Sequence, residues 1–378
     1  MSDMDIAIIG SGMVGASIAY AIGGRAKVLL LEAESAPGYH ATGRSAALFA
    51  ESYGPDAIRA LTRASKAFLV SPPPGFANVP LLHPRGALMV GPADHRDQLL
   101  SFEETLRAEG VQAQRLEGQA LYDAVPVLKP EAIALGVLDP GAQDIDVDAL
   151  LQGFLRGARA QGAVLVTGAR VTSIQRLTDG WQLTTAEGQV FNARQVINAA
   201  GAWADEVAKL AGVPIVGLEP RRRSAFLFEP PAGIDASAWP AVISIDETWY
   251  FKPDAGLILG SPANQDPVHP HDVVAEEFDV ALGIYNIENA TTLTIHRPRS
   301  TWAGLRSFVA DGKPVCGFDP SQADFFWAAA LGGYGIQTSP AFGRLCAALL
   351  LAESIPEDIS AEGLDPVAIA VRAMVALT

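Results

Sequence analysis

The chain has 378 residues, of which 49% are hydrophobic and 18% charged, and its formal net charge is −15. The hydrophobic fraction excludes a disordered chain, and the length exceeds what one hydrophobic core usually supports, so we expect two closely joined domains. The acidic balance, with a sequence pI near 4.8, disfavours nucleic acid and anionic membranes as partners, because like charges repel. We therefore expect a small molecule as the main partner.

Cysteine and histidine patterns give no sign of a metal site or a disulfide framework. Cys316 and Cys346 are far apart and lack the paired spacing of either. The segment HPHD, residues 269–272, has no third partner for a metal and is expected to be a solvated turn. The apolar residues 6–22 follow acidic residues where a secretory signal would be positive, and no later run reaches transmembrane length. These features predict a cytoplasmic protein.

The first predicted unit, residues 5–34, is a strand, a glycine-rich turn, a helix and a second strand. Ile6 to Ile9 form an apolar run typical of a parallel strand buried on both faces. The turn carries the G-x-G-x-x-G pattern, which lets the backbone approach a pyrophosphate at the helix N-terminus. The second strand leads to Glu32, whose carboxylate can accept hydrogen bonds from ribose hydroxyls. The pattern predicts a dinucleotide site and leaves FAD and NAD both open.

Three later segments add to this unit. Residues 40–54, HATGRSAALFAESYG, are rich in small residues that would let a helix start press against a planar ring system. Residues 195–213 predict a buried strand, an Ala-Ala-Gly turn and a helix. Residues 325–354 predict a strand, a glycine turn and a long helix.

With these segments, the chain resembles the FAD-dependent amine oxidoreductases, a family that includes D-amino-acid oxidase, glycine oxidase, sarcosine oxidase and the bacterial D-amino-acid dehydrogenases. The resemblance covers nearly the whole chain. It is closest to the D-arginine dehydrogenase type, through the motifs PGYHATGRSAA, RRSAF, GSPAN, NATTLTI, TWAGLRSFVADG and GGYGIQTS. It implies the fold and FAD as the cofactor, and it is much less specific for the substrate.

The resemblance implies an α/β fold, α+β overall, of the glutathione-reductase-like class. A Rossmann-type FAD-binding domain would be interleaved with a substrate domain built on an antiparallel or mixed β-sheet. We expect the FAD-binding domain in residues 1–48, 145–218 and 305–378, and the substrate-binding domain in residues 49–144 and 219–304. Asp146 is expected to cap a helix over residues 147–160, and residues 250–261 to form a hairpin around a Pro-Asp-Ala-Gly turn.

The resemblance also implies which residues bind FAD, with the backbone of Val171 meeting the adenine. The predicted set is Gly10, Ser11, Gly12, Met13, Val14, Gly15, Leu31, Glu32, Ala33, His40, Thr42, Gly43, Arg44, Ser45, Ala46, Ala47, Arg170, Val171, Ala199, Ala200, Gly201, Trp203, Arg306, Gly332, Gly333, Tyr334, Gly335, Ile336, Gln337 and Thr338. The turn at residues 332–338 opens a helix, so its N–H groups would stabilise negative charge on the reduced flavin. The context of Cys316, KPVCGFDP, does not resemble the attachment site of covalent sarcosine oxidases, so we expect non-covalent FAD.

Three consecutive arginines, Arg221, Arg222 and Arg223, begin an apolar strand. Successive side chains of a strand face opposite ways, so Arg222 cannot share a face with its neighbours. A guanidinium holds a carboxylate through two parallel hydrogen bonds, which would orient the substrate Cα–H bond. The resemblance assigns this role to Arg223 and Arg306, and we expect Arg221 and Arg222 to be solvated or ion-paired.

The remaining predicted catalytic residues are Tyr53, Tyr250 and Gly333. The resemblance places the two tyrosine hydroxyls beside the carboxylate or amine of the substrate, and Gly333 in the flavin-facing turn. Without the resemblance, each tyrosine would be interpreted as an amphipathic core residue.

The segment LLHPRGALMV, residues 81–90, bears on the substrate. Where the D-arginine type carries an acidic residue, this chain has Gly86 and Ala87, and residues 48–50 are apolar where that type has a histidine and polar neighbours. An unpaired buried cation is costly, so we expect a neutral D-amino acid or a related secondary amine acid, with Leu48 and Ala87 lining its pocket. Glu51 would favour a basic substrate if it pointed inward.

The expected reaction is oxidative deamination of a D-amino acid by hydride transfer from Cα to flavin. The imino acid would then hydrolyse to a 2-oxo acid and ammonia. Alternatives are the oxidation of glycine-like or sarcosine-like amines or of a 2-hydroxy acid, a nicotinamide enzyme, and a non-catalytic flavin-binding subunit. Oxygen or a quinone-like carrier would accept the electrons, and the sequence does not decide between them.

Overall fold

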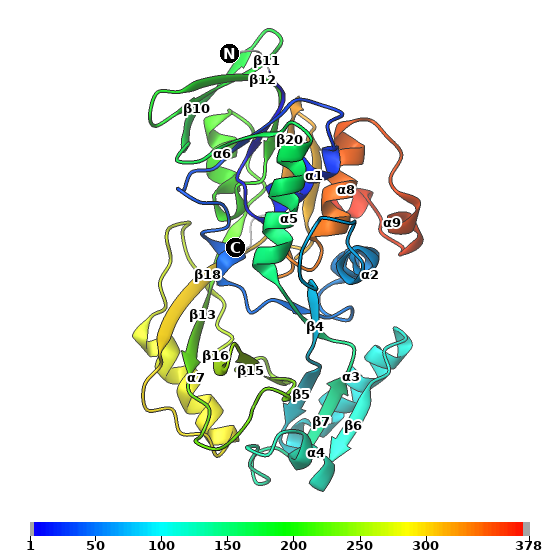
Figure 1. Cartoon of the computed structure of the whole chain (residues 1–378), viewed down its shortest axis with the longest axis vertical. Helices are drawn as coiled ribbons and strands as arrows, with labels where there is room; N and C mark the ends of the chain where they lie inside the picture. The colour runs from blue at the N-terminus through cyan, green and yellow to red at the C-terminus, as the bar shows by residue number, and fades with distance from the viewer. Residues whose placement is uncertain (1–3, 373–378) are drawn as a thin grey trace.

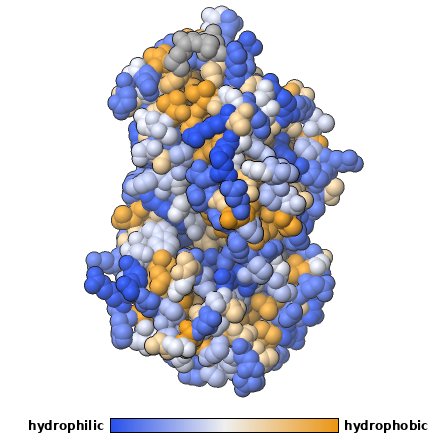
Figure 2. All heavy atoms as spheres, viewed as in Figure 1, coloured by the Kyte–Doolittle hydropathy of each residue, from blue (hydrophilic) through white to orange (hydrophobic). Residues whose placement is uncertain are grey.

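The computed structural model describes residues 4–372, which form an elongated molecule with one large sheet toward each end of its long axis (Figure 1). Residues 1–3 and 373–378, which belong to the predicted FAD-binding domain, lie outside the described part. Hydrophilic residues cover most of the face in Figure 2, and the hydrophobic ones form separate groups. Within the described residues, no helix combines the length and the apolar character needed to cross a membrane.

The first sheet occupies the upper half of Figure 1 and has eight strands. Its main path is β10–β11–β12–β1–β2–β9, with β20 beside β12 and β19 beside β20. The bounds are β1 Met4–Ile9, β2 Val28–Leu31, β9 Val164–Val166, β10 Val171–Leu177, β11 Gly180–Thr185, β12 Val190–Asn198, β19 Val315–Asp319 and β20 Gln322–Ala329. Strands β20, β12, β1, β2 and β9 run parallel to one another, as the apolar runs predict.

Helices cover both faces of this sheet because alternate residues of β1 face opposite ways. Ile6 and Ile8 belong to a core shared with α1 (Met13–Ile22), α5 (Val147–Ala160) and α8 (Ser339–Leu350). Ala7 and Ile9 belong to a second core, shared with α6 (Ala204–Leu210). The first β-α-β unit therefore has the layered arrangement that positions a dinucleotide site at the carboxyl ends of the strands.

The second sheet has nine strands and lies in the lower half of Figure 1. Its path is β17–β13–β16–β15–β14–β5–β7–β6, with β18 beside β13. The bounds are β5 Ala87–Gly91, β6 Gln114–Glu117, β7 Leu135–Asp139, β13 Glu219–Phe228, β14 Ala241–Ser244, β15 Tyr250–Asp254, β16 Leu257–Ser261, β17 Asp266–Pro267 and β18 Ser300–Phe308. Its pairs are antiparallel except for β14 with β5, which are parallel, so the sheet is mixed.

The remaining elements connect or cover the two sheets. They are the small sheet of β3 Leu48–Phe49, β4 Leu82–Pro84 and β8 Gln143–Ile145; the helices α2 Asp56–Val70, α3 Arg96–Ala108, α4 Gln119–Ala124, α7 Glu277–Ala290 and α9 Glu357–Ala361; and the 3-10 turns η1 Ala41–Arg44, η2 Ala93–His95, η3 Gly201–Trp203 and η4 Val367–Ile369. Phe226 and Phe251 are fully buried in the core beneath the second sheet, which α7 helps to cover.

The structure confirms the predicted fold class and two local expectations. Asp146 caps α5, its side chain accepting a hydrogen bond from the Ala149 N–H at 2.8 Å. Residues 250–261 form the β15–β16 hairpin, with Ala255 and Gly256 at positive φ in the turn. The domain boundaries stay a prediction, and the one at residue 305 falls inside β18.

Candidate active site

A cavity of about 810 Å³ is lined by residues from both large sheets. Its first end is formed by the glycine turn after β1, the end of β2 and the turn after β12. Its second end is formed by the face of the second sheet that carries Arg223 and Tyr250. The loop that contains Tyr53 lines the space between them. A cavity of this size, composed of a glycine turn and a charged sheet face, suits a cofactor and a substrate side by side.

The glycine turn approaches its neighbours too closely for side chains. A Cβ at Gly10 would lie 2.5 Å from the Ala199 carbonyl oxygen, and its φ of +99° also favours glycine. Glu32 ends β2, and its Oε2 atom accepts hydrogen bonds from the Ser11 N–H at 3.0 Å and the Ser11 hydroxyl at 2.8 Å. The turn and the predicted ribose acceptor are therefore held together by the protein itself.

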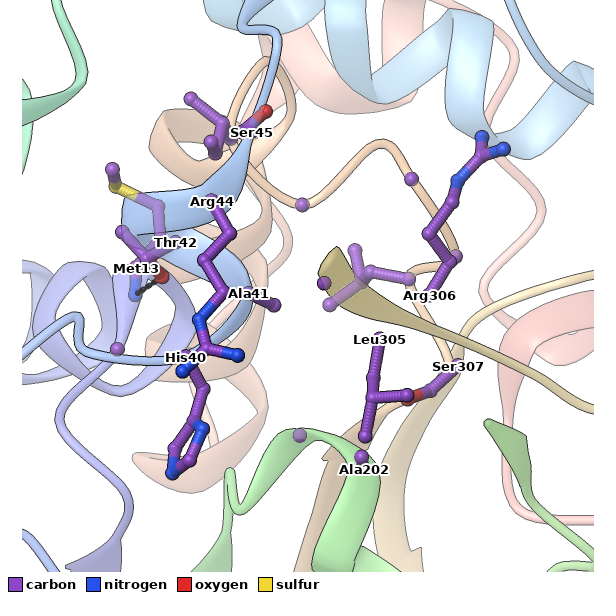
Figure 3. Close-up of a pocket in the computed structure, with 18 of the residues that line it drawn as sticks. Met13, His40, Ala41, Thr42, Arg44, Ser45, Ala202, Leu305, Arg306 and Ser307 are labelled. Carbon is purple, nitrogen blue, oxygen red and sulfur yellow. Dashed lines mark hydrogen bonds between the residues drawn. The ribbon is translucent and has the colours of Figure 1, made fainter. Parts of the chain in front are cut away.

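The segment around η1 forms one wall of the cavity, opposite β18 (Figure 3). Thr42 accepts a hydrogen bond from the Met13 N–H at 3.1 Å, which joins this segment to the start of α1. Arg44 donates to the Val273 and Ala303 carbonyl oxygens at 2.8 and 3.1 Å. These bonds attach the flavin-facing wall to the second sheet.

The C-terminal glycine turn packs directly on β18. The Gly332 N–H donates to the Ser307 carbonyl oxygen at 2.9 Å, and Gly332 has a φ of +53°. A side chain at Gly333 would overlap the Arg306 guanidinium. The predicted flavin-facing turn and the predicted carboxylate-binding arginine are therefore adjacent.

The register of β13 with β18 brings the two predicted arginines to one sheet face. Arg221 is paired with Arg306, and Arg223 with Gly304, so these side chains face the same way. Arg222 faces the other way and forms an ion pair with Asp279 at 3.0 Å. Arg221 forms an ion pair with Glu219 through its Nε atom at 2.6 Å. Both neighbours are thus ion-paired, as expected.

The two arginines are held differently. Arg306 donates to the Tyr53 hydroxyl at 3.1 Å, and its guanidinium lies 5.8 Å from the centroid of the Tyr334 ring. Arg223 donates through Nε to the Asn264 carbonyl oxygen at 2.8 Å. Its Nη2 atom is buried and has no hydrogen-bond partner within residues 4–372. An unpaired buried guanidinium nitrogen at a cavity wall can donate a hydrogen bond to a negatively charged ligand.

The local electrostatics favour such an anion. Burial and then the like charge of Arg306 lower the pKa of Arg223, so the two cations repel each other until a negative group binds. Burial raises the pKa of Tyr334 to about 12, which keeps its hydroxyl protonated. The negative charge of Glu247, which also lines the cavity, acts on both groups.

Every predicted flavin, catalytic and pocket residue lines the cavity except Ser11, Gly15, Gly43, Tyr334 and Thr338. Ser11 is buried against Glu32, and a Cβ at Gly15 or Gly43 would collide with the carbonyl of Gly10 or Gly38. The Tyr334 ring packs edge-on against Tyr53, and Thr338 is fully buried beneath the turn. These five residues contact residues near the cavity and are not among those that line it.

Sequence reasoning missed several lining residues, above all Glu247 and Asp139. Glu247 lies in the turn between β14 and β15 with a φ of +53°, and Asp139 ends β7 as the partner of Ala87. No sequence motif predicts that either residue lines the cavity. The pairing of strands that are distant in the sequence determines which side chains face it. Glu51 forms an ion pair with Lys66 at 2.5 Å and does not line the cavity, so it is not the inward charge considered above.

Two further expectations concern cysteine and metal. Cys316 lies in β19 with its Sγ atom 3.5 Å from that of Cys346, and both side chains are buried in the core. In HPHD, Asp272 forms an ion pair with Arg44 at 2.5 Å. Among the residues that the structure describes, no group of three or more His, Cys, Asp or Glu side chains could hold a metal ion.

Known proteins with similar sequences include a dimethylglycine dehydrogenase and a glycine oxidase. The chain is 29% identical over 273 residues to dimethylglycine dehydrogenase, mitochondrial, of Rattus norvegicus, a match that covers 68% of this chain and 31% of that protein. It is 25% identical to glycine oxidase of Bacillus licheniformis over 93% of this chain and 94% of that protein. The chain spans about a third of the length of the dimethylglycine dehydrogenase. These relatives are not of the D-arginine dehydrogenase type to which the motifs pointed.

Solved structures give the same fold. Glycine oxidase from Geobacillus kaustophilus superposes with a TM-score of 0.85 over 100% of both chains, at 22% sequence identity. The profile of the family described as FAD dependent oxidoreductase, or DAO, matches residues 5–349. The chain therefore belongs to the DAO family of FAD-dependent oxidoreductases.

Proposed function

We propose that this protein oxidises an amine whose nitrogen-bearing carbon also carries a carboxylate, with glycine and N-alkylated glycines as the first candidates. The buried Nη2 atom of Arg223, unpaired within residues 4–372 and close to Arg306, is the observation that carries this proposal. A carboxylate there would receive hydrogen bonds from both guanidinium groups. The similarity to glycine oxidase and dimethylglycine dehydrogenase supports the choice of glycines.

FAD, when bound, supplies the acceptor for the two electrons of this oxidation. The residues present fit it, since the turn at Gly10 excludes side chains and Glu32 ends β2 at the place where a ribose would lie. We infer non-covalent binding, because the Cys316 thiol is buried beside Cys346 and does not line the cavity.

The chain's own residues would bind and orient the substrate. Arg223 and Arg306 would fix the carboxylate, which also fixes the direction of the neighbouring C–H bond. The hydroxyl of Tyr53 is held by Arg306 at 3.1 Å, and Tyr250 lines the same part of the cavity. Glu247 offers a carboxylate that would accept a proton from the substrate ammonium, which must become a neutral amine before oxidation.

A D-amino acid is the second candidate, and the length of the cavity favours it. The lining continues past Ala87 to Met89, Phe102 and Asp139, which leaves room for a substituent that glycine lacks. The imino acid formed from either class would hydrolyse to an oxo acid and an amine or ammonia. Oxygen or a quinone-like carrier would then accept the electrons.

Anaerobic flavin reduction tests the proposal directly. The purified holoenzyme is mixed with glycine, sarcosine, dimethylglycine, D- and L-amino acids and 2-hydroxy acids, and the loss of visible flavin absorbance is followed. Bleaching by at least one amino acid and by no hydroxy acid is the expected result. No bleaching by any amine, or reduction by hydroxy acids alone, would overturn it. Repetition in air with peroxide detection distinguishes the two kinds of acceptor.

Exchange of Arg223 for lysine tests the carboxylate site. Lysine keeps the charge and loses the paired hydrogen bonds, so kcat/KM should fall by roughly 10- to 100-fold, with FAD content unchanged. Arg221→Lys is the matched control, because Arg221 is paired with Glu219 and does not line the cavity. Equal kcat/KM values for the two variants would contradict the assignment.

A further inference from the structure

The far wall of the cavity carries a buried carboxyl group that the proposed reaction does not use. Asp139 ends β7, is 6% exposed and lines the cavity. It is paired with Ala87 of β5, and Ala87 is paired with Ala241 of β14. Since residues that pair across strands share a sheet face, these three side chains form one row that faces the cavity.

Asp139 differs from the other acids near this wall because it has no cation partner within residues 4–372. Asp144 forms ion pairs with Arg85 and Lys252, each at 2.7 Å, and Glu51 is paired with Lys66. The Oδ1 atom of Asp139 accepts a hydrogen bond from the Gly141 N–H at 2.9 Å. No ion pair involving Asp139 is formed in the described part of the chain.

Burial destabilises the charged form of such a carboxyl group. Removal from water raises the pKa of Asp139, and the negative charge of Glu51 acts in the same direction; hydrogen bonds from the Gly141 and Ala142 N–H groups and the positive charge of Lys66 oppose this rise without cancelling it. A buried carboxylate is stabilised when a cation or a strong hydrogen-bond donor reaches it. Because Asp139 lies at the cavity wall, a ligand could supply that group.

The residues in front of Asp139 leave a path to it. Ala87 and Ala241 project only methyl groups into the cavity, and Met89, Phe102 and Ile245 give its sides an apolar character. Tyr250, in β15, is separated from β7 by three strand spacings, or about 14 Å along the sheet. A group that spans this path is an extended, mainly apolar substituent with a polar end.

We propose that Asp139 is a specificity-determining residue that receives the cationic end, an ammonium or a guanidinium, of an extended substrate substituent. This inference rests on the proposed function, in which Arg223 and Arg306 hold the carboxylate at the other end. The substituent can belong to the α carbon, as in a basic D-amino acid, or to the nitrogen, as in an aminoalkyl glycine. The expectation of a neutral substrate depended on Gly86 and Ala87, and it did not take the carboxyl group of Asp139 into account.

Two pairs of substrates with matched length test the inference on the wild-type holoenzyme. The first pair is N-(8-aminooctyl)glycine and N-nonylglycine, whose substituents are long enough for a path of about 14 Å, and the second is D-lysine and D-norleucine. In at least one pair, the charged member should have a kcat/KM roughly 10-fold or more above that of the neutral member. The absence of a preference for the cation in both pairs would overturn the inference, even if Asp139 variants failed to fold.

Asp139→Asn then tests whether this residue is responsible. Asparagine keeps the shape and can still accept from the Gly141 N–H, so the ratio of kcat/KM for the charged member to kcat/KM for the neutral member should fall by roughly 10-fold or more. Glu104→Gln is the matched control, because it removes an exposed charge of α3 that does not line the cavity, and it should alter the preference by less than about threefold. Equal preferences for the cationic substrate in Asp139→Asn and the wild type would contradict the role assigned to Asp139.

An error in the proposed function and an error in the role of Asp139 would give different experimental results. If no carboxylate-bearing amine bleaches the flavin, the proposed function is wrong. If neutral amines bleach it and cationic ones show no advantage, the proposed function stands and the role of Asp139 is wrong. Melting temperature and FAD content, measured for each variant, separate a loss of folding from a loss of recognition.

Discussion

Arg223 lines the cavity from the same face of the second sheet as Arg306. The alternation of side chains along a strand predicts that Arg222 faces away from Arg221 and Arg223, and the ion pair of Arg222 with Asp279 agrees. The alternation of side chains does not predict which face of the strand lines the cavity. That depends on β18, whose register places Arg306 on the same face as Arg223 although 83 positions separate them in the chain.

Tyr334 gives a prediction on pH dependence. Burial raises its pKa to about 12, whereas an unfolded tyrosine ionises near pH 10. Below pH 10 the hydroxyl is protonated in both states, and its contribution to stability is complete. Between pH 10 and 12 only the unfolded state ionises, so rising pH favours unfolding by about 1.4 kcal/mol per unit.

The Tyr334→Phe variant removes this titration. Its free energy of unfolding, measured in urea at pH 9, 10 and 11, should therefore decline less than that of the wild type above pH 10. Differential absorbance near the tyrosinate band would follow the ionisation itself. Parallel pH profiles for the two proteins would show that Tyr334 ionises normally.

At the scale of elements, local patterns specify structure best where one residue type satisfies one backbone requirement. Gly10 fits this description, since its positive φ and its approach to Ala199 both exclude a side chain. The hairpin of β15 and β16 is a partial case, because Gly256 supplies one of the two positive φ values of its tight turn, whereas Ala255 adopts the other although alanine does not favour it. Such elements form from a few neighbouring residues, so the sequence predicts them well.

Asp146 provides the test at this scale. Its side chain accepts from the Ala149 N–H at 2.8 Å, and replacement by alanine should lower the free energy of unfolding by about 1 kcal/mol. Asp146→Asn should retain most of the stability, because asparagine is also a good N-cap. Asp148→Ala, an exposed change in the same helical turn, is the control. Equal losses from alanine at both positions, measured by chemical denaturation, would contradict the capping role.

At the scale of the whole molecule, the cavity exists because two sheets face a shared space and the segment around η1 connects them. Arg44 contributes to this connection by donating hydrogen bonds to the carbonyl oxygens of residues 273 and 303. FAD lying in this cavity would contact segments from three separate stretches of the chain. Its binding should therefore stabilise the entire fold and not one region alone.

Removal and return of FAD test this arrangement. Acid precipitation of the holoprotein should leave the flavin in the supernatant, as expected for non-covalent binding. Addition of FAD to the apoprotein should raise the melting temperature, and at a concentration of 100 Kd the gain in stability should be about 2.7 kcal/mol. Flavin that stays with the precipitated protein, or a melting temperature that does not respond to FAD, would contradict these expectations.

The amino-acid sequence was sufficient to predict the strand-turn-helix start, the cap of α5, the hairpin and most of the segments that line the cavity. Each of these depends on backbone geometry or periodicity within a short stretch, which neighbouring residues encode. The family motifs added the arginine pair by resemblance. Five predicted residues, among them Tyr334 and Thr338, do not line the cavity, because a motif does not distinguish a lining residue from its neighbours.

The identity of the other residues that line the cavity depends on the tertiary structure. Asp139 and Glu247 line the cavity, while Glu51 is paired with Lys66 outside it. The reason is physical: the environment of a side chain in a sheet is set by strands that pair across long stretches of sequence, and β7, β5 and β14 come from three separate parts of the chain. Amino-acid composition and local sequence pattern do not predict that pairing.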